Sequence, residues 1–395
     1  MEDIKNLTLV KRFLKYVSFD TQSIDNGSNN LPSTKGQWDL AYYVAEELKS
    51  LGVDTIEVDE NCFVYASINA SCGFEDKPAI ALFAHLDVSD EVPAKNIFPQ
   101  IVEGEGKFLS KHIIKSDGTT LLGGDDKAGM AEIVTLAEVL LKDIDIKHPK
   151  INIVFTPDEE ICRGVYSINL DKIDAKVGYT LDGTTVGEVT YTNFNAASAT
   201  VEFRGIACHP GNSYNIAKNP NVMLADFISH LPNARPETTK GNQGYVSVCE
   251  SKANTNYACA DLILRSFSKE ELQSWKSKIA EVCNYINKKY NPATCSFSIK
   301  DTYNNMHDII IPKYRFLADN AISAFKEAGI TPLEIPIRGG CDASILAEKG
   351  LYCINLGTGV YMYHSLDEFV CIEEMQQTVD ALVNLVQKKF DVYVK

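Results

Sequence analysis

The chain has few of the features that mark a membrane, secreted or disulfide-linked protein. Its longest apolar stretch, residues 128–141, contains two glutamates and is too short to span a bilayer. The first residues, MEDIK, have neither the basic start nor the apolar run of a signal peptide, so we expect none. The eleven cysteines are odd in number and include no C-x-x-C pair, which predicts reduced thiols that mostly fill the core. We therefore predict a cytoplasmic protein.

Basic residues are also scarce relative to acidic ones. The 38 Lys and Arg residues stand against 53 Asp and Glu residues, which gives a net charge of −15. This balance argues against nucleic acid or a membrane surface as a partner. With 45% hydrophobic residues the chain can bury a full core, and 395 residues exceed the usual size of one domain, so we expect two.

Predicted strands and helices alternate through residues 1–196 and again through 308–395. Continuous apolar runs such as 79–83 and 151–155 are typical of central strands covered on both faces. The pattern predicts an α/β domain, with a mixed twisted sheet and helices on both faces. Residues 197–307 instead follow the order β-α-β-β-α-β, which predicts an inserted open-faced sandwich domain.

The motif TPDEE at 156–160 directly follows the apolar run 151–155. A buried strand that ends in adjacent carboxylates presents them where ligands bind in open α/β sheets. The alternative is helix capping, with Thr156 as N-cap, Pro157 at N1 and Glu159 at N3 of a capping box. The motif alone leaves both interpretations open.

Polar residues follow apolar strands at four further places. The whole set of such residues is His85, Asp87, Asp125, Glu159, Glu160, Asp182 and His364. Each has a structural explanation of its own: a lone His is usually structural, and Asp182 before Gly183 could form a turn. One metal site explains all of these residues together, whereas a structural interpretation needs a separate explanation for each place. The metal site is therefore the simpler interpretation.

Imidazole and carboxylate ligands together suit zinc. Three carboxylates and two imidazoles exceed one four-coordinate ion, but they suit two ions about 3.5–4 Å apart, bridged by a carboxylate and a water. Two Zn²⁺ ions, a bridging hydroxide and the carboxylates of Asp125, Glu160 and Asp182 sum to zero charge, which favours burial.

Two carboxylates remain beside this predicted centre. Asp87, two residues after His85, is placed to accept the second ring N–H of that His and to fix its tautomer. Glu159 is then the surplus carboxylate, and we expect it to be the general base for the bridging water.

Several motifs carry a resemblance to a known family. They are HLD at 85–87, LLGGDDKAG at 121–129, TPDEE at 156–160, DG at 182–183 and His364, together with PSTKGQW at 32–38, NFNAAS at 193–198, HPG at 209–211 and IRGG at 337–340. The chain thereby resembles the co-catalytic dizinc exopeptidases, which include aminoacylase and glutamate carboxypeptidase, and within them the peptidase T family of tripeptide aminopeptidases. The resemblance covers almost the whole sequence.

The resemblance implies a role for each residue. One zinc would be held by His85, Asp125 and Asp182, and the other by Asp125, Glu160 and His364. Glu159 would be the base and Asp87 the partner of His85, and both would be catalytic residues. His209, Arg265 and Arg338 would face the substrate.

The resemblance also implies a division of labour between domains. Residues 1–196 and 308–395 would form the catalytic domain, and 197–307 a lid and dimerisation domain. In relatives that dimerise through this domain a matching His comes from the partner chain, so a homodimer is allowed here.

The function expected is hydrolysis of the N-terminal residue from tripeptides, with the zinc-bridging hydroxide as nucleophile. Alternatives are a dipeptidase, carboxypeptidase or N-deacylase with the same metals, or a binding protein that kept only the fold. Retention of Glu159 argues against the last, because a binding protein needs no surplus base.

Overall fold

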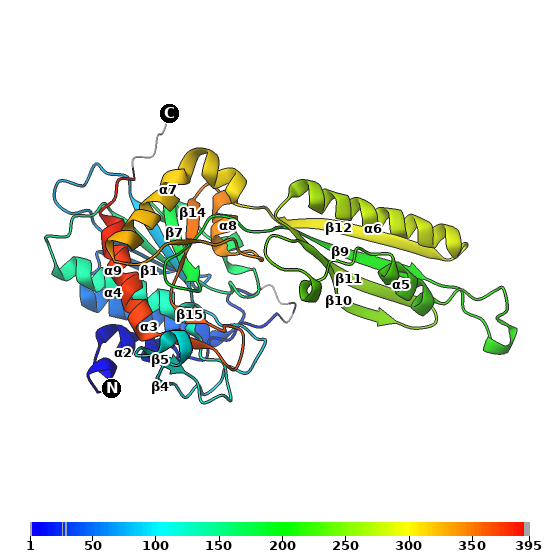
Figure 1. Ribbon diagram of the computed structural model, residues 1–395, viewed down its shortest axis with the longest axis horizontal. Coiled ribbons are helices and arrows are strands. Elements are labelled where there is room, and N and C mark those ends of the chain that lie inside the picture. The colour runs from blue at the N-terminus through cyan, green and yellow to red at the C-terminus, as the bar shows by residue number, and fades with distance from the viewer. Residues whose placement is uncertain (1, 26, 28–29, 391–395) are drawn as a thin grey trace. The chain divides into compact units, whose positions relative to one another are not determined.

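The structure is a computed structural model that describes residues 2–25, 27 and 30–390 (Figure 1). The chain divides into two compact units. Unit 1 comprises Met1–Tyr191, Met306–Ile335 and Cys341–Lys395, and unit 2 comprises Thr192–Asn305 and Pro336–Gly340. The short segment Pro336–Gly340 clusters with unit 2 because Ile337 forms a β-bridge with Asn193.

Unit 1 is built on an eight-stranded sheet in the order β1-β2-β6-β3-β7-β14-β8-β13. The strands are β1 Thr55–Val58, β2 Val64–Ile68, β3 Ile80–His85, β6 Ile151–Thr156, β7 Val177–Gly183, β8 Glu188–Thr190, β13 Leu333–Glu334 and β14 Tyr352–Gly357. Strands β6, β3, β7 and β14 are parallel neighbours, whereas β2 and β8 pair antiparallel with β6 and β14. Every residue of β3 and β6 is buried, as the continuous apolar runs predicted.

Helices cover this sheet, which confirms the predicted mixed α/β architecture. They are α1 Glu2–Lys5, α2 Thr8–Tyr16, α3 Lys35–Leu51, α4 Gly124–Lys142, α7 His307–Glu327, α8 Asp342–Glu348 and α9 Ile372–Val386, with 3₁₀ turns η1 Gly106–Phe108, η2 Gly164–Ser167 and η3 Leu170–Lys172. Helix α4 packs on β3 and β7, α3 on β1 and β2, and α7 and α8 on β14. Among the described helices, none combines the length and apolarity that a membrane crossing needs.

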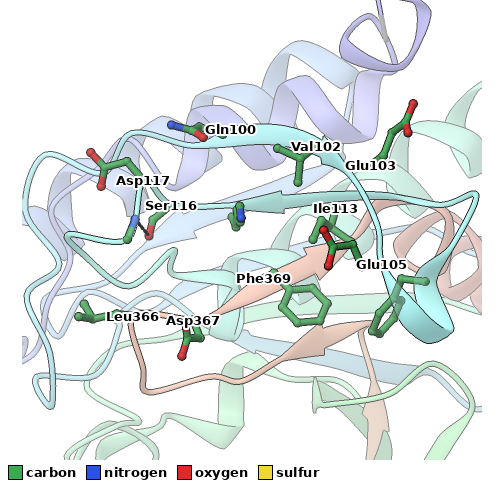
Figure 2. A pocket seen from close by; sticks show the side chains of 13 residues that line it. Gln100, Val102, Glu103, Glu105, Ile113, Ser116, Asp117, Leu366, Asp367 and Phe369 are labelled. Carbon is green, nitrogen blue, oxygen red and sulfur yellow. Dashed lines mark hydrogen bonds between the residues drawn. The ribbon is translucent and has the colours of Figure 1, made fainter.

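A second sheet of unit 1 was not expected as a separate layer. It is antiparallel, in the order β15-β16-β5-β4, with β4 Gln100–Glu103, β5 His112–Lys115, β15 Val360–Tyr361 and β16 Phe369–Cys371. An open cavity of about 760 Å³ lies against it, lined by residues that include Val102, Ile113, Asp367 and Phe369 (Figure 2). This sheet thus brings the segment around residue 113 beside the segment around residue 370.

Unit 2 has the predicted β-α-β-β-α-β order. Its elements are β9 Asn195–Arg204, η4 Pro210–Asn212, α5 Pro220–Ser229, η5 Pro236–Thr238, β10 Tyr245–Ala253, β11 Tyr257–Ser266, α6 Lys269–Lys289 and β12 Thr294–Tyr303. The four strands form an antiparallel sheet in the order β10-β11-β9-β12. Burial alternates along β11, and the inward side chains join Phe227 of α5 and Trp275 of α6 in one core. The open-faced sandwich is therefore confirmed.

Candidate metal centre

Polar residues lie at the carboxyl ends of three neighbouring parallel strands of unit 1. His85 is the last residue of β3, Asp182 lies at the end of β7, and β6 runs into Glu159 and Glu160. Because β6, β3 and β7 are adjacent and parallel, their carboxyl ends meet there. Asp125 adds its side chain from the start of α4.

The structure brings all five predicted ligands together in two groups that share Asp125. In the first group, His85 Nε2 lies 2.9 Å from Asp125 Oδ1 and 3.5 Å from Asp182 Oδ1. In the second group, His364 Nε2 lies 2.9 Å from Glu160 Oε2 and 3.5 Å from Asp125 Oδ2. Asp125 therefore turns one carboxylate oxygen toward each imidazole.

The electrostatics of these groups fit cations. Burial, followed by the charge on Asp125, raises the pKa of Glu160 to about 7 and that of Asp182 to about 8. Burial would lower the pKa of His364, but its hydrogen bonds with Asp125 and Glu160 raise it to about 11. Glu160 Oε1 is buried and has no hydrogen-bond partner. Carboxylates gathered this closely, with one buried oxygen left over, suit divalent metal ions.

Asp87 serves two parts of the site. Its backbone oxygen lies 3.1 Å from His85 Nδ1 and its Oδ1 lies 3.4 Å from the same nitrogen, so Nδ1–H donates and Nε2 is left for a metal. Its carboxylate also accepts the backbone N–H groups of Glu159, at 3.0 Å, and Glu160, at 3.1 Å. Sequence reasoning predicted the contact between Asp87 and His85 but not the hydrogen bonds to Glu159 and Glu160, because backbone donors leave no signal in the sequence.

The capping-box interpretation of TPDEE is wrong. Residues 157–163 form turns rather than a helix, and Asp158 has a φ of 51°. The Thr156 hydroxyl donates to Asp342, 2.8 Å away. The buried carboxylate of Asp158 accepts hydrogen bonds from Ser33 and Gln37, which fixes the turn that carries Glu159. The PSTKGQW motif thereby gains a structural role that the sequence did not reveal.

Glu159 belongs to neither ligand group, directly precedes Glu160 in the chain and is only partly buried. Burial, followed by the negative charges of Asp182 and Asp342, raises the pKa of Glu159 well above its ordinary value. A carboxylate with a raised pKa holds a proton more strongly, which suits a general base.

Comparison with known proteins identifies the family. A model of the peptidase dimerisation domain matches residues 191–291. Peptidase T of Clostridium perfringens is 38% identical over 399 residues, which cover 95% of this chain and 98% of that protein. Peptidase T of Caldanaerobacter subterraneus is also 38% identical, over 96% of this chain and 98% of its own. This chain belongs to the peptidase T family. It is therefore an enzyme, an exopeptidase, as its motifs predicted.

Solved structures agree on the fold. Aminopeptidase PepT of Bacillus cereus is 23% identical with a TM-score of 0.80, over 96% of this chain and 97% of that one. A Staphylococcus aureus tripeptidase is 20% identical with a TM-score of 0.79, over the same shares of the two chains. A Bacillus subtilis protein described as a dinuclear metal-binding peptidase is 16% identical with a TM-score of 0.69, over 98% of both chains. The fold of these peptidases thus extends over almost the whole chain.

The three residues expected to face the substrate belong to unit 2, unlike the predicted metal ligands. The guanidinium of Arg338 donates to Thr239 O at 3.0 Å, Thr239 Oγ1 at 2.8 Å and Gln243 O at 3.1 Å. Arg265 donates to the backbone oxygens of Ala197 and Leu264. Within the part of the chain that the structure describes, neither guanidinium pairs with a carboxylate. Their roles toward substrate therefore stay predictions in this member of the peptidase T family.

His209 is exposed at the start of η4, and its Nδ1 accepts the Gly211 N–H at 3.2 Å. A neutral ring that accepts through Nδ1 carries its proton on Nε2. Nε2 of His209, the ring nitrogen that does not contact Gly211, is thus a hydrogen-bond donor.

Two buried charged residues near the predicted ligands were missed. Lys127 is fully buried, its Nζ donates to Phe19 O at 3.3 Å, and burial lowers its pKa to about 8. Glu368, four residues after His364, is 1% exposed and accepts three backbone N–H groups, two from the loop before α4 and one from Asp125 at the start of that helix. Glu368 directly precedes β16, a short strand that the sequence analysis did not predict.

Proposed function

We propose that this peptidase T family member is a dizinc aminopeptidase that releases the N-terminal residue of tripeptides. The observation that carries the proposal is Asp125, which turns one oxygen toward each of two groups of potential ligands. The names of its fold relatives, an aminopeptidase, a tripeptidase and a dinuclear metal-binding peptidase, support it. We place the activity in the cytoplasm, because no disulfide joins any of the cysteines.

The residues of unit 1 divide the work as follows. His85 and Asp182 would hold one ion, Glu160 and His364 the other, and Asp125 both. When bound, the two zinc ions would supply the Lewis acidity that lets water attack an amide at neutral pH. Glu159 would take a proton from the attacking water and pass it to the departing amine. Asp87 would hold both the His85 ring and the turn that carries Glu159.

We further propose that Arg265 or Arg338 binds the C-terminal carboxylate of the tripeptide. A guanidinium has five N–H donors in a planar fork that matches a carboxylate. Each of these two uses only part of that capacity in the contacts above, and Arg338 Nε is buried without a partner among the residues that the structure describes.

Amidating the C-terminus of a tripeptide substrate should therefore slow its hydrolysis. Loss of a buried charge pair costs roughly 2–4 kcal/mol in transition-state binding, or about 30- to 700-fold in kcat/KM. Arg265→Gln and Arg338→Gln identify the anchor, because the variant that lacks it should no longer discriminate acid from amide. Arg204→Gln, an exposed Arg of the same unit, is the matched control. Equal turnover of acid and amide would remove both arginines from the site.

The same assay separates the alternatives. An aminopeptidase must recognise the free α-amine, so the N-acetylated tripeptide should be a poor substrate. A carboxypeptidase or deacylase would hydrolyse the acetylated peptide, and a dipeptidase would prefer the dipeptide. Either of these last outcomes would replace the proposed specificity while leaving the metal chemistry in place.

We also propose a homodimer in which His209 donates a hydrogen bond to the oxyanion of the reacting amide in the partner's site. The match of residues 191–291 to the peptidase dimerisation domain supports the dimer. The exposed ring of His209, with its proton on Nε2, supports the donor role. Such a donor is worth about 3 kcal/mol in comparable oxyanion sites.

Mixing two inactive variants tests this arrangement. Glu159→Gln and His209→Ala chains, dissociated and rejoined at equal amounts, should recover about a quarter of the wild-type activity, because half of the dimers are hybrids with one complete site. A Glu159→Gln and Asp125→Ala mixture is the control, since both defects lie in the same unit and no complete site can form. Full activity of His209→Ala alone, or a rejoined dimer that never recovers activity, would refute action across the dimer.

A further inference from the structure

Glu368 lies between the segment that carries His364 and strand β16. Its two neighbours, Asp367 and Phe369, line the open cavity shown in Figure 2, whereas Glu368 is 1% exposed. The carboxylate of Glu368 is not among the side chains that line the cavity; it points into unit 1, toward the backbone of Leu122 and Gly123. A carboxylate that is this strongly buried needs donors there.

The donors are backbone amides of the loop that leads into α4 and of the irregular first residues of that helix. Glu368 Oε2 accepts the N–H groups of Leu122, at 2.8 Å, and Gly123, at 2.7 Å. Its Oε1 accepts the N–H of Asp125 at 3.0 Å. Asp125 and Asp126 have non-helical backbone angles, so the regular helix starts only after them. The carboxylate thus holds the irregular part of the chain that presents Asp125.

The loop is also packed closely against this segment. Gly123 has a φ of 80°, which favours glycine, and a Cβ on Gly124 would come within 2.7 Å of Val370 Cγ1 and 3.2 Å of Glu368 Oε1. The loop therefore rests directly on Glu368 and on the strand that follows it.

We propose that Glu368 is a positioning residue that fixes the Asp125 loop relative to the His364 segment before any metal binds. The proposal rests on the proposed function, because it assumes that Asp125 and His364 are ligands of one centre. These two residues belong to the same ligand group, and they come from chain segments more than 200 residues apart. Glu368 ties one segment to the other through three hydrogen bonds, so it lowers the cost of ordering both ligands when a metal arrives.

Zinc titration of the metal-free chain tests the proposal. Glu368→Gln keeps the shape of the side chain but turns an amide NH₂ toward backbone donors, and we expect both stepwise zinc affinities to fall by about 10- to 100-fold. Asp367→Asn removes one charge at the adjacent, cavity-lining position and should leave both affinities within about twofold of wild type. Affinities are measured against a competing chromophoric chelator, with circular dichroism as the check on folding. Activity of the Glu368→Gln chain should recover when zinc is saturating.

Three results decide the matter. A folded Glu368→Gln chain with wild-type zinc affinity overturns the proposal, even if its melting temperature has dropped, because the role would then be structural only. If that variant does not fold, Glu368→Asp replaces it: the charge stays but the side chain is shorter, so wild-type affinity there also overturns the proposal. A wild-type chain that binds no zinc would instead refute the proposed function itself.

Discussion

Replacing Glu159 with glutamine should lower kcat by about 10²-fold or more while KM changes little. Glutamine keeps the shape of the side chain but cannot accept the proton of the attacking water. The turn that carries it should survive, because Asp87 holds this turn through the backbone N–H of residue 159 and not through the side chain. Metal content should therefore stay at the wild-type level, measured by elemental analysis beside steady-state kinetics.

The neighbouring residue provides a matched control. Glu160→Gln makes the same chemical change one position further on, but Glu160 lies in a ligand group 2.9 Å from His364 Nε2. Its expected defect is loss of metal, with activity that returns partly at high zinc. A Glu159→Gln enzyme with nearly normal kcat would show that Glu159 is not the base. Helix capping would not be an alternative role for Glu159 in that case, since no helix starts at Thr156.

Replacing Asp125 with alanine should remove both ions and reduce hydrolysis to background. The carboxylate lies in both ligand groups, so its loss leaves each predicted ion short of a ligand and of a negative charge. His85→Ala removes a ligand from one group only, and it should mainly weaken one of the two ions. Metal content per chain after dialysis against a weak chelator distinguishes the two variants.

Asp117→Ala is the control for this experiment. Asp117 is an exposed acidic residue that lines the cavity of Figure 2, and it belongs to neither ligand group. This variant should keep about two ions per chain. An Asp125→Ala chain with a full metal complement and full rate would refute the shared-ligand arrangement.

Much of the architecture could be predicted from sequence patterns within single strands and helices. Largely apolar runs predicted β3 and β6 because a strand covered on both faces has few polar side chains. Alternation marked β11 because only one face of the unit 2 sheet is covered. Local patterns could not place Pro336–Gly340, whose membership of unit 2 depends on a bridge between Asn193 and Ile337.

The candidate site could be predicted where it consists of side-chain groups. It could not be predicted where main-chain amides hold those groups in place. The five candidate ligands were predicted as His, Asp and Glu residues that follow apolar segments of the sequence, and the structure brings them together. The contacts of Glu368 could not be predicted, because its partners are main-chain amides 243 to 246 residues away. The hydrogen bonds from the backbone N–H of Glu159 to Asp87 and from the backbone N–H of Ser33 to Asp158 could not be predicted for the same reason.

The place of β14 has a consequence for synthesis on the ribosome. This strand lies between β7 and β8 in the sheet, although β7 and β8 are close in sequence and β14 is made about 160 residues later. The strands and helices of unit 2, β9 to β12 with α5 and α6, have all been made by Tyr303. The nascent chain can therefore form the sheet and both helices of the inserted unit while the sheet of unit 1 still has a gap beside β7. The gap closes only when β14, Tyr352–Gly357, has emerged. His364 and Glu368 follow directly after this strand, so they emerge at the same late stage.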